Sequence, residues 1–173
     1  MRTVKILLFL FCLVSVQLGW AAESDVFHRA EQFHGDSCTG LIIGLRLGVA
    51  AKQALTARGA EGKLKARVYT NGCPVDGIQV ATGATLGTRS IEVIDRKENV
   101  LILSDKKGTK QVEARLTPVA QQKSKRSLEL KKLLGTAPEG SEKARQLQEE
   151  AEAIKAWFRT AADDQVIVVR KVR

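Results

Sequence analysis

The segment FHGDSCTG, residues 33–40, places three side chains with metal-binding or nucleophilic chemistry within five positions. These side chains are His34, Asp36 and Cys38, and an apolar run follows them at once. Imidazole, carboxylate and thiolate groups together suit zinc or another divalent transition metal. A cysteine and a histidine can alternatively form an activated nucleophile, with Cys38 as the attacking group and His34 as its base.

The cysteines allow a third interpretation. The sequence contains Cys12, Cys38 and Cys73, and Cys12 lies in an apolar N-terminal stretch that we expect to be removed. In an oxidising compartment, two remaining cysteines most often form one disulfide. A Cys38–Cys73 disulfide would make the protein a structural or binding module without a metal.

Residues 1–21 have the features of a signal peptide. Arg2 and Lys5 form a basic start, ILLFLFCLVSV is a short apolar core, and Gly19 and Ala21 offer a cleavage site between small residues. We therefore expect an exported protein, periplasmic or secreted. Contact with a membrane is expected only through an uncleaved signal segment.

Charge and composition limit the partners. The chain has a net charge of +9, and loss of the two basic residues of the signal segment lowers this to +7. This charge suits an anionic surface. We do not expect nucleic acid as a partner, because an exported chain with few aromatic residues has no recognisable binding motif. The expected partner is a metal ion or a small ligand, and the sequence leaves a homodimer open.

The elements that position the site can be predicted from periodicity. A short helix is expected over residues 24–33, and a buried central helix over residues 39–58, whose apolar residues are nearly continuous. Gly40, Gly44 and Gly48 repeat every four residues of this central helix. They form a stripe without side chains, along which another backbone can approach closely.

The remainder predicts one α+β domain over residues 22–173, in which an antiparallel sheet packs against the glycine-striped central helix and additional helices. A basic connecting segment is expected over residues 119–140, with a helix from Ser124. Residues 141–173 are expected to hold a docking helix and the final strand. Strands are predicted over residues 65–70, 90–95, 99–104, 110–116 and 165–172, with a turn at RKEN joining the second and third of them in a meander.

Both cysteines are expected at helix starts. Cys38 immediately precedes the central helix, and Cys73 is expected at the N-cap of a short helix with Pro74 at its first position. Free N–H groups and the helix dipole stabilise negative charge there and lower the pKa of a thiol. This placement favours a thiolate ligand or nucleophile, while the disulfide stays open.

Two long motifs resemble those of the FmdE family, which is named after a component of formylmethanofuran dehydrogenase. FHGDSCTGLIIGLRLG is similar to its signature H-G-H-x-C-P-G with a following glycine-bearing helix, and CPVDGIQVATGATLG to its signature C-x-V-D-A-I-Q-x-x-T-G-C-T-x-G. The resemblance implies a metal-associated cleft, to which His34, Cys38, Cys73 and Asp76 correspond. Our leading hypothesis is a metal site built from His34, Asp36, Cys38 and Cys73. The matching residues that would support this site are Asp76, Gln79, Thr82 and Thr85.

The sequence also departs from the family pattern. These departures imply weaker binding, a different metal or a lost role, and whether the domain is an enzyme stays open. No cysteine follows Cys73, whereas many relatives carry a C-terminal zinc ribbon. The other departures are Asp36 in place of a second histidine, Thr39 in place of proline, Tyr69 in place of an acidic residue, Ala84 in place of cysteine and Thr88 in place of lysine.

Overall fold

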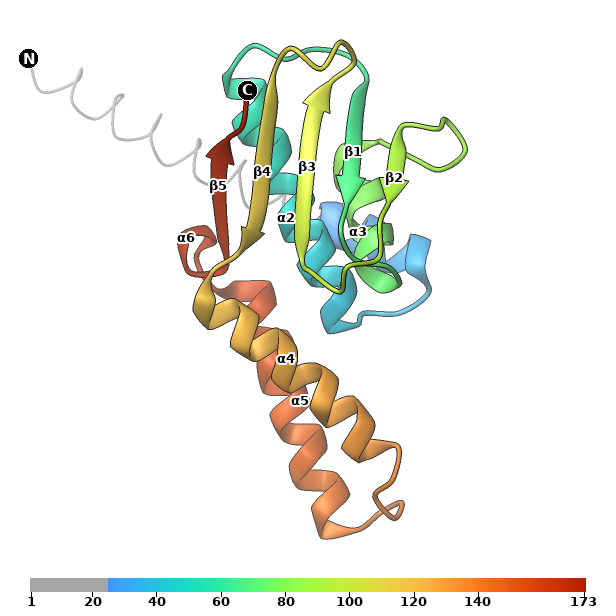
Figure 1. Ribbon diagram of the computed structural model, residues 1–173. Helices are drawn as coiled ribbons and strands as arrows, with labels where there is room; N and C mark the ends of the chain where they lie inside the picture. Colours follow the sequence, from blue (N-terminus) through green and yellow to red (C-terminus); the bar gives the residue numbers. More distant parts are fainter. Residues whose placement is uncertain (1–24) are drawn as a thin grey trace, which may run out of the picture.

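The computed structural model describes residues 25–173, so the predicted signal segment lies outside the described residues (Figure 1). The described part is α+β, as predicted. A helix over residues 25–34 comes first. The other elements are α2 (Thr39–Ala57), β1 (Leu64–Val68), α3 (Cys73–Thr82), β2 (Ile91–Val93), β3 (Val100–Asp105), β4 (Gln111–Leu116), α4 (Pro118–Leu134), α5 (Glu142–Thr160), α6 (Asp163–Val166) and β5 (Ile167–Lys171).

The five strands form one mixed sheet in the order β2-β1-β3-β4-β5. The pairs β1–β3, β3–β4 and β4–β5 are antiparallel, whereas β1 and β2 are parallel. The predicted pairing of β2 with β3 around RKEN is therefore wrong. The intervening loop passes across the end of β1, where the Tyr69 carbonyl accepts from the N–H groups of Arg96 and Glu98 at 3.0 Å. As a result, β1 lies between the two strands.

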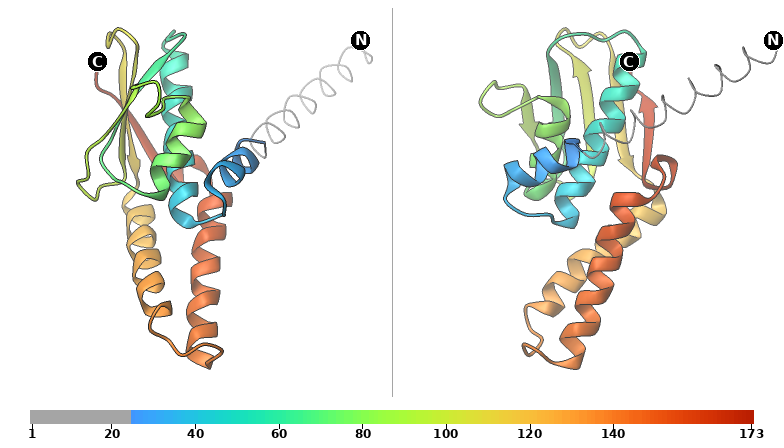
Figure 2. Two further views of the ribbon diagram at one scale, coloured as in Figure 1. Left: turned by 90° about the vertical axis from the view of Figure 1, so that its right-hand side faces the viewer. Right: turned by 180° about the vertical axis from the view of Figure 1, so that it is seen from behind.

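The core lies between one face of the sheet and the helix α2 (Figure 2, left). Leu101, Leu103 and Val112 are fully buried on the sheet, and Leu45 and Leu47 on α2. Among residues 25–173, α2 is the one helix long and apolar enough to cross a membrane. Because 56% of that stretch is buried inside the protein, its apolar composition is explained by its place in the core.

The helices α4 and α5 form a hairpin that projects beyond one end of the sheet (Figures 1 and 2). The helix predicted from Ser124 begins earlier, at Pro118. Thr117 explains this start, because its hydroxyl accepts from the Ala120 N–H at 3.1 Å and caps the helix. Phe158 near the end of α5 is fully buried, so this end of the hairpin docks on the core.

A buried arginine fixes that docked end. Arg46 of α2 is only 5% exposed, and its guanidinium donates to the carbonyls of Phe158 (3.0 Å) and Ala161 (2.7 Å) and to the carboxylate of Asp163 (2.7 Å). The charge that interrupts the apolar run of the central helix is thus paired with the last turn of α5 and with α6.

Candidate metal centre

Glycines bring α2 and α3 into backbone contact. A Cβ atom added at Gly44 would overlap the Pro74 carbonyl oxygen, and one added at Gly48 would lie 2.5 Å from the Ala81 Cβ. The predicted close approach along the glycine stripe is therefore confirmed. Gly77 of α3 completes the contact, since a Cβ there would overlap the Leu41 carbonyl oxygen. Sequence reasoning missed Gly77, although a glycine inside a ten-residue helix was its visible signal.

This close contact places the starts of the two helices side by side. Cys38 is the N-cap of α2, as expected, and its Sγ accepts from the Leu41 N–H at 3.4 Å. Cys73 is not an N-cap but the first residue of α3. The cap is Gly72, whose φ of +73° favours glycine and whose carbonyl accepts from Val75 N–H at 3.0 Å.

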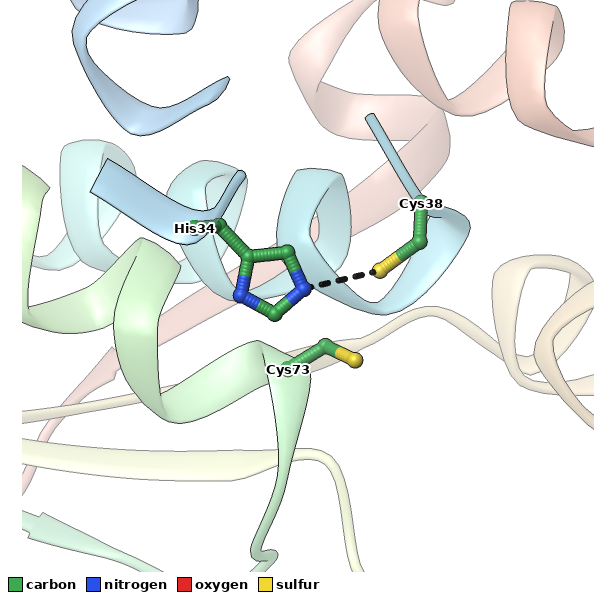
Figure 3. A group of neighbouring side chains, drawn as sticks. All are labelled: His34, Cys38 and Cys73. Atoms are coloured by element: carbon green, nitrogen blue, oxygen red, sulfur yellow. Dashed lines mark hydrogen bonds between the residues drawn. The ribbon is translucent and has the colours of Figure 1, made fainter. Parts of the chain in front are cut away.

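His34 comes from a third segment, at the last position of the helix over residues 25–34. Gly35, with a φ of +94°, then turns the chain back toward Cys38. The His34 Nε2 lies 3.6 Å from the Cys38 Sγ, and Cys73 lies beside them at the start of α3 (Figure 3). One ligand atom from each of His34, Cys38 and Cys73 lies within 4.8 Å of the others.

Asp76 orients the imidazole. The His34 Nδ1 donates to the Asp76 Oδ2 at 2.7 Å, across 42 positions of sequence. A carboxylate only accepts hydrogen bonds, so the ring proton is held on Nδ1 and the lone pair is left on Nε2, the nitrogen beside Cys38. Metal-binding histidines in proteins commonly have such a carboxylate partner.

The environment of Cys73 opposes ionisation of its thiol. Burial and the neighbouring Cys38 thiol raise the pKa of Cys73 to about 11. The prediction that a helix start would lower this pKa is therefore wrong for Cys73, because desolvation and the adjacent sulfur outweigh the helix terminus. A divalent cation between the sulfurs would reverse this balance, since it stabilises both thiolates.

The remaining predicted site residues lie outside this three-residue group. The Asp36 Oδ1 lies 3.6 Å from the His34 Nε2, but the Asp36 side chain is 73% exposed. Gln79 donates to the Asp76 Oδ1 at 3.3 Å and so acts through Asp76. The Thr82 hydroxyl donates to the Ile78 carbonyl (2.7 Å) in the last turn of α3 and accepts from the Ala84 N–H (3.1 Å). The Thr85 N–H donates to the Ser90 hydroxyl (2.9 Å). Thr82 and Thr85 shape the following loop.

The donor set fits a transition metal. Two sulfurs and an imidazole nitrogen are the ligands that zinc takes in proteins, and tetrahedral zinc separates two bound sulfurs by about 3.8 Å. The group lies within 4.8 Å, so small side-chain rotations would close it around an ion. The His34, Cys38 and Cys73 group could thus hold a metal through three protein ligands. Three ligands leave one tetrahedral position for another group.

Known proteins are similar to the chain in sequence and in fold. A probable S-adenosyl-L-methionine-binding protein of Archaeoglobus fulgidus is 33% identical over 150 residues. That match covers 78% of this chain and 41% of the relative, so the chain spans about two fifths of the relative's length. The crystal structure of a tungsten formylmethanofuran dehydrogenase FmdE-like protein from Syntrophus aciditrophicus matches with a TM-score of 0.57 at 21% identity. The match covers 87% of this chain and 72% of that one, and it shows a common fold.

A family model matches most of the chain. Residues 33–168 match the model of the family FmdE, described as "Molybdenum formylmethanofuran dehydrogenase operon". The matched range includes His34, Cys38 and Cys73, together with the whole sheet apart from the last residues of β5. The chain belongs to the FmdE family.

Proposed function

We propose that the protein is an exported FmdE domain that binds a divalent transition metal, with zinc as the best match, through His34, Cys38 and Cys73. The observation that carries this proposal is the convergence of three ligand atoms from three separate segments. Thiolates and imidazole select zinc over magnesium or calcium, which prefer oxygen ligands. The basic start and apolar core of residues 1–21 support export.

The histidine favours a metal over a disulfide module. Cys38 and Cys73 are both free thiols. A disulfide would use neither the imidazole of His34 nor its 2.7 Å hydrogen bond to Asp76. A metal uses both, because Asp76 keeps the Nε2 lone pair available as a ligand.

A bound metal would act as a Lewis acid or as the attachment point of a small ligand at its fourth position. The chain's own residues prepare this site. The Leu41 N–H donates to the Cys38 sulfur and stabilises its thiolate, while Asp76 holds the ring of His34. Asp36 could take the fourth position only if its 73% exposed side chain turned inward from its place 3.6 Å from the His34 Nε2.

The 3.6 Å separation of Cys38 and His34 also favours one second function, a thiol enzyme in which His34 activates Cys38. Metal dependence separates the two functions. A nucleophile is alkylated rapidly at Cys38 in a way that depends on His34 and is insensitive to added zinc. A metal ligand is protected from alkylation by zinc, together with Cys73.

The decisive test is metal analysis of protein purified from the exported fraction of the cell. We expect about one transition metal per chain, with metal lost in Cys38→Ser and Cys73→Ser. Ser37→Ala is the matched control, because the Ser37 hydroxyl donates to Glu31 at 2.9 Å and not to the site. Metal-free protein with a Cys38–Cys73 disulfide would overturn the proposal. Mass spectrometry of the same sample tests export, for which we expect an N-terminus at Ala22 or Glu23.

A further inference from the structure

The side chain of Gln79 joins the candidate metal centre to the loop that follows α3. Its Nε2 donates to the Asp76 Oδ1 at 3.3 Å, and its Oε1 accepts from the backbone N–H of Leu86 at 3.1 Å. The Leu86 N–H can only donate and the Asp76 carboxylate only accepts. These two partners therefore fix the direction of the Gln79 amide.

The contacts form a chain of hydrogen bonds that converges on the Asp76 carboxylate. The Leu86 N–H donates to Gln79, Gln79 donates to Asp76, and the His34 Nδ1–H donates to the other oxygen of Asp76 at 2.7 Å. With Asp76 accepting from both sides, its carboxylate cannot turn away from His34 without breaking a second bond. We propose that Gln79 is a positioning residue that holds the Nε2 lone pair of His34 toward the metal and couples the metal site to the loop over residues 83–90.

The loop has a defined anchor at its exposed tip. The Leu86 side chain is 61% exposed, yet its backbone N–H is held by Gln79. Hydroxyl groups close the rest of the loop, with 2.9 Å between the Thr85 and Thr88 Oγ1 atoms and 2.7 Å between Thr88 Oγ1 and Ser90 Oγ. Movement of Leu86 is therefore transmitted to Asp76 and His34. By linkage, metal binding at His34 must stabilise the same loop.

This inference rests on the proposed metal function for its role, but its geometry can be tested without metal. The chain has two histidines, His28 and His34, so their ring nitrogens can be resolved by 15N NMR of the metal-free protein. We expect His34 in the Nδ1–H tautomer, because Nδ1 faces the Asp76 carboxylate. His28 lies on the exposed face of its helix and serves as the internal reference.

The test compares Gln79→Ala and Gln79→Glu with the wild type. Gln79→Glu keeps the length of the side chain but removes the donor and places a second carboxylate against Asp76. Gln53→Ala is the control, because Gln53 is an exposed glutamine of α2. Three readouts are measured: the His34 tautomer, hydrogen exchange of the Leu86 N–H, and zinc affinity.

We expect both Gln79 variants to mix the His34 tautomers and to bind zinc about tenfold or more weakly. Gln79→Ala should also exchange the Leu86 N–H faster, whereas Gln79→Glu keeps an oxygen that can accept from it. Gln53→Ala should match the wild type. An unchanged tautomer in both variants would overturn the positioning role, even if zinc affinity fell. If the wild type binds no zinc, the proposed function fails, and the tautomer and exchange data still decide whether Gln79 positions His34.

Discussion

The α2–α3 pair and the α4–α5 hairpin are both packed helix pairs, but different atoms hold them together. In the first, Gly44 and Gly77 put backbone against backbone, and the helix starts bearing Cys38 and Cys73 meet as a result. In the hairpin, the side chain of Leu130 is fully buried and Arg126 pairs with Glu150 on the surface. The contact between α2 and α3 has no room for an added atom. The contact between α4 and α5 depends on side chains, which can be shortened or changed in charge.

The largest effect is expected from Gly44→Leu. Overpacking usually costs about 1–3 kcal/mol, and here even the first added carbon would overlap the backbone of Pro74. We expect a loss above that range, seen as a large fall in melting temperature, together with loss of zinc binding as Cys38 and Cys73 move apart. A neutral or stabilising shift would mean that the two helices do not meet at Gly44.

The opposite change should be the damaging one in the hairpin. Leu130→Ala removes a fully buried side chain from α4, and such truncations cost about 2–5 kcal/mol. We expect a loss of stability near the lower end of this range. Few residues of the hairpin are buried, so the surroundings of Leu130 can relax into the space that the truncation leaves. Denaturant unfolding measures the loss. Zinc affinity is measured under conditions in which the variant is as fully folded as the wild type, and it should then equal the wild-type value. A loss of affinity under these conditions would show that the hairpin supports the site.

An exposed ion pair joins the two helices of the hairpin. The Arg126 guanidinium contacts both oxygens of Glu150 at 2.7 Å and holds the pKa of that carboxyl below its ordinary value of 4.5. A lowered folded-state pKa stabilises the protein at higher pH, and this contribution is lost as the pH falls through the lowered value. We expect Arg126→Ala to lower the melting temperature slightly at neutral pH and not in acid. High salt should shrink the difference, since both groups are exposed. The same small difference at every pH would rule out a role for this ion pair.

The smallest effect should be a gain. Gly135 ends α4 with an ordinary φ of −66°, and a Cβ there would lie 3.5 Å from the Lys132 carbonyl oxygen, a normal contact. Gly135→Ala should stabilise the protein by about 0.4–1 kcal/mol, because it restricts the unfolded chain. The same substitution at Gly44 should destabilise the protein, so the change in stability caused by one added methyl group should have opposite signs in the two helix pairs. A loss of stability at Gly135 would mean that the hairpin is also packed too tightly for an added carbon.

Periodicity was enough to predict the central helix and its glycine stripe, since a repeat of four residues defines one side of a helix. The order of the strands was harder to predict, because nothing in the three residues of β2 indicates that β1 lies between β2 and β3. The thiol pKa depended on packing as well. A helix start is a local feature, but the burial of Cys73 and its contact with Cys38 arise only when α2 and α3 meet.

The ligands of the site could be predicted, but not the hydrogen bond that orients the histidine. His34, Cys38 and Cys73 were expected and do converge. The hydrogen bond from His34 to Asp76 joins residues 42 positions apart, and no local pattern reports it. Asp36 was expected among the ligands because it lies close in sequence, but the turn at Gly35 leaves its side chain largely in solvent.

Zinc titration of the reduced protein, with proton release measured in parallel, tests the central claim most directly. We expect about one zinc per chain. At least the Cys73 proton should be released on binding, because its pKa of about 11 keeps that thiol protonated at neutral pH. Affinity should therefore rise with pH and should fall sharply in Cys38→Ser and Cys73→Ser. Two results together would contradict the account. The reduced wild type would take up no zinc, and the native protein would be about two mass units lighter than the reduced protein because of a disulfide.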